Sequence, residues 1–396
     1  MKKIFQIVLI LCLTTIITKA QWEQLNSGTS QNLYSICFTD ANTGYTVGRG
    51  GVILKTTDGG DNWVSKTSGT TNELFTVFFL TENIGFIGGD WGTILKTTDA
   101  GENWSLKLSG IDYNCFFSIY FFDENKGFAV GDDIIVSTSD GGENWEAINT
   151  GYQERFYDVY FIDNNTGFIV GSYGTILKTI DGGATWDMIS SGTDEWILSM
   201  FFVNGSTCFV SGTTGLMMKS TDACYNWTNQ VSGTDDNLIS IFFIDENIGY
   251  AAGEWGVILK TTNGGNDWVD MNSGLDSEFD DIFFINENVG FIVGSNGSIY
   301  KYTGSVSVSE NKLIEDFLIY PNPANSIISI TSDSNLSEQI QVSIFNLKGE
   351  LVLSNLYEKS TGIDISSLNE GVYFVEINFN NETTFKKKCN SIIIKI

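Results

Sequence analysis

The sequence predicts an all-β chain: a seven-bladed β-propeller closed by its N-terminal strand, followed by a small C-terminal β-sandwich. Three observations predict this fold. Tryptophan recurs every 41 residues, each interval holds four short apolar runs, and the first and last intervals are incomplete in complementary ways. A constant interval of this length indicates one supersecondary unit stacked on copies of itself. The tryptophans are Trp22, Trp63, Trp104, Trp145, Trp186, Trp227 and Trp268.

The fourth repeat shows the content of one unit. Apolar runs at 156–162 and 168–170 are separated by a polar turn that ends in glycine. A second turn leads to the run at 175–179, and an Asp-Gly-Gly turn precedes Trp186 and a last short run. Four runs of about 5 residues with Gly, Asn and Asp between them predict four antiparallel strands, which make one propeller blade.

The two ends of the array predict how the ring closes. The last repeat has three of its four runs, over residues 280–302, but lacks the tryptophan segment. Residues 22–28 match the tryptophan segment at 63–69 and have no strands before them. We expect the N-terminal strand to complete the last blade, because this pairing removes two free edges that would promote aggregation. Trp22 is the predicted closure residue.

The chain outside the repeats predicts export. Lys2 and Lys3 precede an apolar stretch that ends in small residues at Ala20, which is typical of a secretory signal peptide. No other segment is long and apolar enough to be an integral membrane segment. The predicted boundaries are 1–20 for the signal peptide, 21–303 for the propeller, 304–313 for a linker and 314–396 for the C-terminal domain.

The charge balance limits the partners. The chain has 21 basic and 48 acidic residues and a net charge of −27. Removal of residues 1–20, which contain three lysines and no acid, makes the net charge −30. Such a surface repels nucleic acid and anionic membranes. We therefore expect an exported monomer that binds no nucleic acid.

Two cysteines of the fifth repeat replace glycines of the other repeats. Cys208 stands just after the first turn and Cys224 stands in the third turn. These turns share one end of an antiparallel meander, so we expect a Cys208–Cys224 disulfide in an exported protein. Cys37, Cys115 and Cys389 receive no assignment.

A Thr-Thr-Asp-Gly-Gly-Asp-Asn-Trp segment at 56–63 recurs five more times in register. It resembles the Asp-box, Ser/Thr-x-Asp-x-Gly-x-x-Trp, of the sialidase-type propellers and their relatives. The carboxylate suits the backbone N–H groups of its own hairpin, the glycine supplies a positive φ, and the indole covers the blade edge. One copy per blade predicts a structural role. The structural residues are Asp58, Trp63, Asp99, Trp104, Asp140, Trp145, Asp181, Trp186, Asp222, Trp227 and Trp268, with Asn263 in place of the sixth Asp.

The residue inventory excludes most catalytic chemistry. The chain contains no histidine, which removes histidine triads, histidine metal ligands and imidazole proton transfer. The resemblance to sialidases implies three arginines around the substrate carboxylate, yet Arg49 and Arg155 are the only arginines. We expect no catalytic residues, no cofactor and no metal. A carboxylate-pair glycosidase, as in the xyloglucanases with similar propellers, stays open.

The whole unit is similar to another repeat. Its pattern, Asn-x-Gly-Phe-x-x-Gly and then Ile-Leu-Lys-Thr-Thr-Asp-Gly-Gly-x-x-Trp, resembles that of the photosystem II stability and assembly factor-like propellers over residues 22–302. In that family a basic, arginine-rich surface is associated with docking to a membrane partner. This chain has no arginine cluster, so the resemblance implies the fold and does not imply a photosynthetic role.

The C-terminal segment resembles the sorting domain of the Bacteroidota type IX secretion system. Tyr-Pro-Asn-Pro-Ala at 320–324, the runs at 342–349 and 363–374, and the tail at 386–396 follow the pattern of that domain in order. The resemblance implies the type IX machinery as a partner of residues 314–396. It also implies passage through the periplasm to the outer-membrane surface or the medium, with removal or lipopolysaccharide attachment of the domain.

Candidate ligand-binding residues lie in the turns opposite the Asp-boxes. Propellers commonly bind there, and aromatic rings beside acids suit stacking on sugars or gripping peptides. We therefore expect a binding propeller for a polysaccharide or an extracellular protein; the alternatives are a carboxylate glycoside hydrolase and a scaffold without a small ligand. The candidate residues are Arg49, Trp91, Tyr173, Trp255, Tyr152, Arg155 and Trp196.

Overall fold

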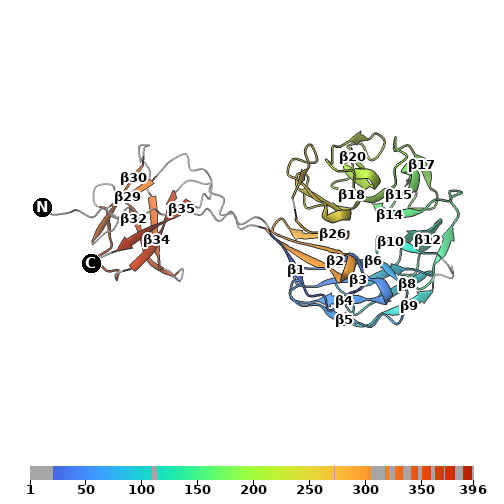
Figure 1. The fold of residues 1–396 in the computed structure, drawn as a ribbon, viewed down its shortest axis with the longest axis horizontal. Helices are drawn as coiled ribbons and strands as arrows, with labels where there is room; N and C mark the ends of the chain where they lie inside the picture. The colour runs from blue at the N-terminus through green and yellow to red at the C-terminus, as the bar shows by residue number, and fades with distance from the viewer. Residues whose placement is uncertain are drawn as a thin grey trace. The chain divides into compact units, whose positions relative to one another are not determined.

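The computed structural model describes residues 21–108, 114–271, 273–304, 317–320, 326–332, 340–346, 350–357, 362–369, 371–379 and 387–394. The predicted signal peptide, and the predicted linker beyond Gly304, lie outside these described residues. The chain divides into two compact units, Met1–Ser305 and Val306–Ile396. Seven four-stranded sheets form a ring in the first unit, so the predicted seven-bladed propeller is confirmed (Figure 1).

Each sheet is an antiparallel meander from an innermost strand to an outer strand. We number the blades 1 to 7 in the chain order of their innermost strands, and the first, second and third turns of a blade connect its four strands in order from the innermost outward. The innermost strands are β2 (Leu33–Phe38), β6 (Leu74–Phe79), β10 (Phe116–Phe121), β14 (Phe156–Phe161), β18 (Ile197–Phe202), β22 (Leu238–Phe243) and β26 (Phe279–Asn286). The second strands are β3 (Gly44–Gly48), β7 (Gly85–Gly89), β11 (Gly127–Gly131), β15 (Gly167–Gly171), β19 (Cys208–Gly212), β23 (Gly249–Gly253) and β27 (Val289–Gly294).

The two remaining positions complete each blade. The third strands are β4 (Ile53–Thr56), β8 (Thr93–Thr97), β12 (Ile134–Thr138), β16 (Ile176–Thr179), β20 (Met217–Ser220), β24 (Ile258–Thr261) and β28 (Ile299–Thr303). The outer strands are β5 (Val64–Lys66), β9 (Ser105–Leu108), β13 (Glu146–Ile148), β17 (Asp187–Ile189), β21 (Thr228–Asn229), β25 (Val269–Asp270) and β1 (Gln21–Leu25). Short 3-10 segments form five second turns: η1 (Arg49–Gly51), η2 (Ser172–Gly174), η3 (Thr213–Gly215), η4 (Glu254–Gly256) and η5 (Ser295–Gly297).

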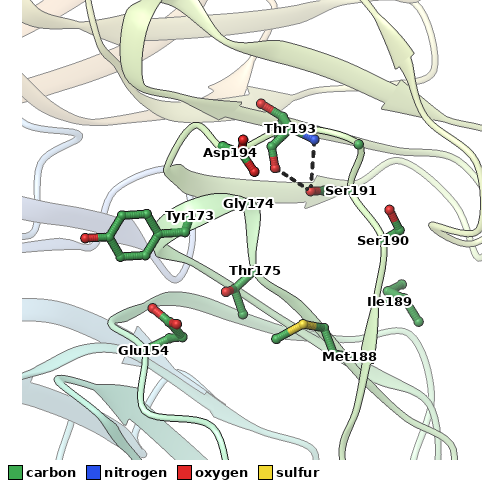
Figure 2. A pocket seen from close by; sticks show the side chains of 11 residues that line it. Glu154, Tyr173, Gly174, Thr175, Met188, Ile189, Ser190, Ser191, Thr193 and Asp194 are labelled. Carbon is green, nitrogen blue, oxygen red and sulfur yellow. Dashed lines mark hydrogen bonds between the residues drawn. The ribbon is translucent and has the colours of Figure 1, made fainter.

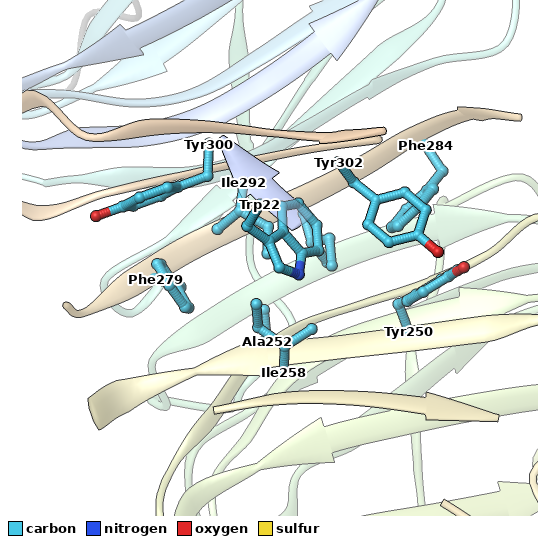
Figure 3. Close-up of a cluster of buried hydrophobic side chains, with 10 residues drawn as sticks. Trp22, Tyr250, Ala252, Ile258, Phe279, Phe284, Ile292, Tyr300 and Tyr302 are labelled. Atoms are coloured by element: carbon cyan, nitrogen blue, oxygen red, sulfur yellow. The ribbon is translucent and has the colours of Figure 1, made fainter. Parts of the chain in front are cut away.

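The N-terminal strand closes the ring, as predicted. β1 pairs antiparallel with β28, and Trp22 lies opposite Tyr302 in this register. The Trp22 indole is 7% exposed and lies 5.2 Å from the Tyr302 ring and 6.2 Å from the Phe284 ring, centroid to centroid (Figure 3). The seventh sheet therefore has the order β1-β28-β27-β26.

Neighbouring blades pack through a repeated aromatic pair. A phenylalanine near the end of each innermost strand stacks on an aromatic ring in the second strand of the preceding blade, with centroids 3.7–5.1 Å apart. Such stacking adds to the free energy gained from burying the rings. The pairs are Phe38–Phe291, Phe79–Tyr45, Phe121–Phe86, Phe161–Phe128, Phe202–Phe168, Phe243–Phe209 and Phe284–Tyr250.

Two glycines of each standard blade make room for this pair. A Cβ on Gly44, at the start of the second strand, would lie 2.6 Å from the Phe38 ring. A Cβ on Gly60, in the third turn, would lie 2.4 Å from the Phe291 ring, and Gly60 has a φ of +85°. Both distances are shorter than any ordinary carbon contact. A side chain at either position would therefore move a stacked ring.

Blade 5 carries Cys208 and Cys224 at these two positions. Their Sγ atoms lie 3.0 Å apart, and both thiols are buried beside Phe168 and Phe202. A disulfide bond is about 2.0 Å long, so the two thiols are neighbours without a covalent bond in this structure. The predicted disulfide stays a prediction.

Lysines join each blade to the next on the Asp-box side. Lys55 Nζ donates to the carbonyl of Ala100 and to Glu102, each at 2.7 Å, and the same lysine recurs every 41 residues except in blade 3. There Ser137 takes its place, and Lys126 of the first turn donates instead to the carbonyl of Gly182 at 2.7 Å. Sequence analysis did not single out these lysines, although their period matches that of the tryptophans.

The Asp-box aspartates hold their own hairpins. Asp58 accepts hydrogen bonds from Thr56 Oγ1 at 2.8 Å and from the backbone and side-chain amides of Asn62 at 2.9 and 2.7 Å. The bonds from Asn62 lower the pKa of Asp58 to about 2. In the sixth copy the two residue types are exchanged: Asn263 stands at the Asp position and donates to Asp267 at 2.8 Å. The exchange keeps the hairpin bond.

The second unit contains two sheets, as expected for a β-sandwich. Ile328, Val342, Ile344 and Val375 are buried and come from both sheets. One sheet has the order β29 (Phe317–Tyr320), β30 (Ile327–Ser332) and β33 (Ile363–Asp364). The other has the order β32 (Leu351–Tyr357), β31 (Ile340–Phe345), β34 (Gly371–Phe379) and β35 (Lys387–Ile394).

Loss of the closure strand should abolish cooperative unfolding. Deletion of residues 22–28 leaves β28 without its partner, and Trp22→Ala alone should lower the free energy of unfolding by about 3–5 kcal/mol because a large buried ring is removed. Urea unfolding followed by tryptophan fluorescence measures both effects. Glu23→Ala, on the same strand but exposed, is the control, and unchanged melting of the deletion variant would refute the closure.

Oxidation should link Cys208 to Cys224. The two sulfurs need to approach each other by only about 1 Å to reach bonding distance. We expect a peptide map of the secreted protein under non-reducing conditions to contain the linked pair, and Cys208→Ser to remove it. A map in which both peptides run free would disprove the disulfide.

Candidate functional site

One face of the propeller brings together all the candidate ligand-binding residues. We call it the turn face; it comprises the second turns and the connections between blades. Each second turn is tied to a connection, because its first backbone N–H donates to the carbonyl that precedes the innermost strand, at 2.8–3.1 Å in all seven blades. The described connections are 26–32, 67–73, 114–115, 149–155, 190–196, 231–237 and 273–278, and the second turns are 49–51, 90–92, 132–133, 172–174, 213–215, 254–256 and 295–297.

Three exposed aromatic residues occupy left-handed backbone positions on this face. Trp91, Tyr173 and Trp255 have φ values of 54°, 52° and 55°, and their exposed fractions are 55%, 66% and 68%. The equivalent turn positions of two other blades hold Gly50 and Asn296, the residue types that tolerate this conformation. A bulky residue in this backbone conformation is strained and destabilises the folded state.

A further set of rings borders the mouth of the central channel. Centroids are 5.3 Å apart between Tyr34 and Phe75, 5.2 Å between Phe75 and Phe117, and 5.7 Å between Phe117 and Tyr157. Trp196 extends this series, because its ring lies 6.0 Å from Tyr157 and 6.1 Å from Tyr173. We call these rings the aromatic arc.

Sequence analysis missed the first four rings of this arc. They occupy the second position of four successive innermost strands, β2, β6, β10 and β14. The other three innermost strands have Leu198, Ile239 and Asp280 there.

The central channel contains a cavity of about 360 Å³. Below the aromatic arc, a ring of hydroxyl and carboxyl side chains lines it. These side chains join the innermost strands, because each accepts a hydrogen bond from a backbone N–H of a neighbouring blade at 2.9–3.4 Å. The pairs are Ser35 with Val77, Ser118 with Val159, Asp158 with Met200, Ser199 with Ile241, Ser240 with Ile282 and Asp281 with Ile36.

Burial raises the pKa of three aspartates in this channel. The pKa of Asp158 and of Asp281 rises to about 6, although each carboxylate accepts hydrogen bonds from a serine and from backbone N–H groups. The pKa of Asp280 rises to about 8, because burial is reinforced by the charges of Glu278 and Asp281. Asp280 is therefore a carboxyl group that holds its proton at neutral pH.

Two hollows adjoin the outer part of blades 3 and 4. One has a volume of about 700 Å³ and is lined by Glu154, Tyr173, Met188 and Thr193 among others (Figure 2). The second has a volume of about 570 Å³ and shares Glu154 as a wall. Tyr152 lines the second hollow, and its Oη accepts a hydrogen bond from Met188 N at 3.4 Å.

Both arginines are held by acids. Arg49 Nε lies 3.3 Å from Glu73, and Arg155 Nε lies 2.5 Å from Asp132. The Arg155 guanidinium also lies 5.7 Å from the centre of the Phe117 ring. Of the candidate residues, Trp196 belongs to the aromatic arc, Tyr173 and Arg155 contact its rings, and Tyr152 lines the second hollow. Arg49, Trp91 and Trp255 lie on other blades of the same face.

Comparisons with known proteins match both units. Residues 14–111 and 143–234 match the family described as photosynthesis system II assembly factor YCF48. Residues 318–395 match the secretion system C-terminal sorting domain. The chain therefore combines a propeller that is similar in sequence to this assembly-factor family with a segment that matches the sorting domain. The sorting domain indicates export through the type IX secretion system.

Solved structures with low sequence identity to this chain have a similar fold. The structure of YCF48 bound to D1 peptide superposes with a TM-score of 0.62 at 22% identity, over 74% of this chain and 99% of that one. YCF48 from Cyanidioschyzon merolae gives 0.60 at 21% identity, over 72% and 99%. The WD40 propeller domain of Doa1 gives 0.58 at 13% identity, over 73% and 98%. No curated protein sequence matches the chain.

Metal sites and membrane spans are both absent from the described residues. Within them, no group of His, Cys, Asp and Glu side chains has an arrangement that could hold a metal ion. No helix among them combines the length and apolar character of a membrane-spanning segment.

The buried channel carboxyls should make the propeller less stable as the pH rises. The folded-state pKa of Asp280, about 8, exceeds the unfolded value of about 4. Its contribution is therefore complete below about pH 4 and is lost as the pH rises through about 8. Melting temperatures between about pH 4 and 9 should fall less in Asp280→Asn than in the wild type. Glu82→Gln, which removes an exposed charge, is the control; parallel curves for all three proteins would contradict the assignment.

Proposed function

We propose that the protein is an exported, non-enzymatic binding propeller whose ligand docks on the turn face. The ligand is an extended protein segment or a polysaccharide outside the cell. The three exposed rings at left-handed turn positions carry this proposal. Gly50 and Asn296 show that the same turn forms without an aromatic residue, so the fold does not require Trp91, Tyr173 or Trp255. Local strain without a structural need is typical of ligand-contacting positions.

The aromatic arc supports the same face. Tyr34, Phe75, Phe117, Tyr157 and Trp196 present half-buried rings around the channel mouth. Rings held in place by neighbouring rings lose little freedom when a ligand covers them. The similar YCF48 structure is of a complex with a peptide, which supports a protein segment as a ligand class.

Asp280 is the observation that favours a glycoside hydrolase as the second candidate. Its carboxyl has a pKa of about 8 and lines the channel cavity beside aromatic rings, as a general acid requires. Release of reducing sugars from extracellular polysaccharides by the wild type, abolished in Asp280→Asn, would establish this activity.

Replacement of the turn-tip rings should separate binding from stability. In a double variant, Trp91→Asn with Trp255→Asn, we expect the free energy of unfolding to stay constant or to rise by roughly 0.5–1 kcal/mol per site, because asparagine tolerates a positive φ better than tryptophan. Ligands bound by the wild type on glycan and peptide arrays should lose signal. Thr214→Asn, at an equivalent left-handed position, is the control.

Two outcomes would oppose the binding role. Equal array signals for the wild type and the double variant would show that Trp91 and Trp255 do not contact the ligand. Absence of any bound ligand for both proteins would favour a scaffold role.

Export should depend on residues 314–396, because the sorting-domain match lies within them. A variant without this segment should accumulate in the periplasm, as measured by immunoblotting of periplasmic, surface and medium fractions. Unchanged delivery to the surface or medium would argue against the assignment.

A further inference from the structure

We propose that the ligand of the turn face is a lysine- or arginine-rich segment of an extracellular protein. This inference rests on the proposed function and specifies the partner. Its basis is a separation of charge between the two faces of the propeller, and a combination of ring, carboxylate and cation that recurs on one face and lacks its cation at two positions of the other.

The turn face is acidic and almost free of cations. Its described residues include no lysine and only two arginines, Arg49 and Arg155, which are already paired with Glu73 and Asp132. A concentration of unpaired carboxylates raises the local density of cationic ligands and their association rate. The acids of this face are Glu73, Asp90, Asp132, Asp133, Glu154, Asp194, Glu195, Asp235, Asp236, Glu254, Asp276 and Glu278.

The propeller lysines serve the opposite face. Eight of the nine contact an Asp-box loop of the next blade, through a hydrogen bond, an ion pair or a ring. Lys260 faces blade 7, which has no Asp-box loop, and its amine lies 5.1 Å from the Tyr250 ring centre. The lysines of this unit therefore do not neutralise the turn face.

On the Asp-box face the chain combines a ring, a carboxylate and an ammonium group. Lys55 Nζ lies 5.6 Å from the centre of the Tyr45 ring and 2.7 Å from Glu102. Lys301 Nζ lies 5.7 Å from the Phe291 ring centre and 2.7 Å from Asp61. A cation between a carboxylate and a ring gains from both interactions.

On the turn face one such group is complete, formed by Arg155, Asp132 and the Phe117 ring. At two other positions of this face an acid and a tryptophan are neighbours without a cation. Glu195 precedes Trp196, and Glu254 precedes Trp255. These carboxylates accept hydrogen bonds from neutral groups, Thr213 Oγ1 at 2.7 Å and Asn237 Nδ2 at 3.0 Å. No lysine or arginine of the described residues forms an ion pair with either glutamate. The side-chain ammonium or guanidinium of a partner would complete the group.

An extended peptide with several basic side chains fits the spacing of these features better than a single cation does. The acid–tryptophan pairs belong to different blades, and Glu154 separates the two open hollows of blades 3 and 4. A segment with several basic side chains can contact them together. Neutral sugars would stack on the rings but would gain nothing from the twelve acids of this face.

Fluorescence anisotropy with defined probes tests the inference. The probes are a labelled peptide of alternating lysine and glycine, its counterpart with glutamate in place of lysine, and labelled cellohexaose. The proteins are the mature full chain and two triple variants with the same change of charge. One alters the turn face (Glu154→Gln, Glu195→Gln, Glu254→Gln), and the other alters the first turns of the Asp-box face (Glu82→Gln, Glu124→Gln, Glu246→Gln).

The expected result is binding of the lysine peptide alone. The turn-face variant and the Trp91→Asn, Trp255→Asn double variant should each weaken it by roughly tenfold, while the Asp-box-face variant should stay within about twofold. Equal weakening by both triple variants would show diffuse attraction and overturn the inference. Ring-dependent binding of cellohexaose without binding of the lysine peptide would overturn the inference and leave the proposed function standing. Unchanged binding of the lysine peptide and of cellohexaose in the Trp91→Asn, Trp255→Asn double variant would overturn both the inference and the proposed function.

Discussion

The stacked aromatic pair between neighbouring blades is the constraint on which the rest of this propeller depends. Each pair joins an innermost strand to the second strand of the preceding blade, and it recurs at all seven junctions, including the junction between blades 7 and 1. In most blades the pair leaves no space for a Cβ at two positions, which explains why the glycines at Gly44 and Gly60 recur in most repeats. The tryptophan packs edge-on against the same phenylalanine, as Trp63 does on Phe38 at 6.1 Å. The 41-residue interval in the sequence therefore corresponds to one junction between neighbouring blades.

The repeated features were accessible from the sequence because each is local. The tryptophan interval, the half-blade at each end and the Asp-box hairpins involve residues that lie within one repeat or at matching ends. Compensating changes, in which one residue takes over the role of another, were not accessible in the same way. Lys126 replaces a missing lysine through a different turn, and Asn263 and Asp267 exchange roles, so position-by-position comparison records a loss where the structure retains the interaction.

The candidate site was predicted in part for the same reason. The turn tips Trp91, Tyr173 and Trp255 stand out in the sequence because other repeats have small residues there. The arc of Tyr34, Phe75, Phe117 and Tyr157 does not stand out, because alternating apolar residues are ordinary in a strand. The packing of successive blades places these side chains next to one another. Likewise, the separation of charge between faces follows from the direction of each turn and is invisible in the net charge.

The closure strand also determines at which stage of folding the ring can close. Trp22 and Tyr302 are direct partners, yet almost the whole propeller lies between them in the chain. Contacts between such distant segments form late, because the entropy of a long loop must be overcome first. The earliest-made strand therefore waits, unpaired, for one of the last, and the ring cannot close before almost the whole propeller has been synthesised.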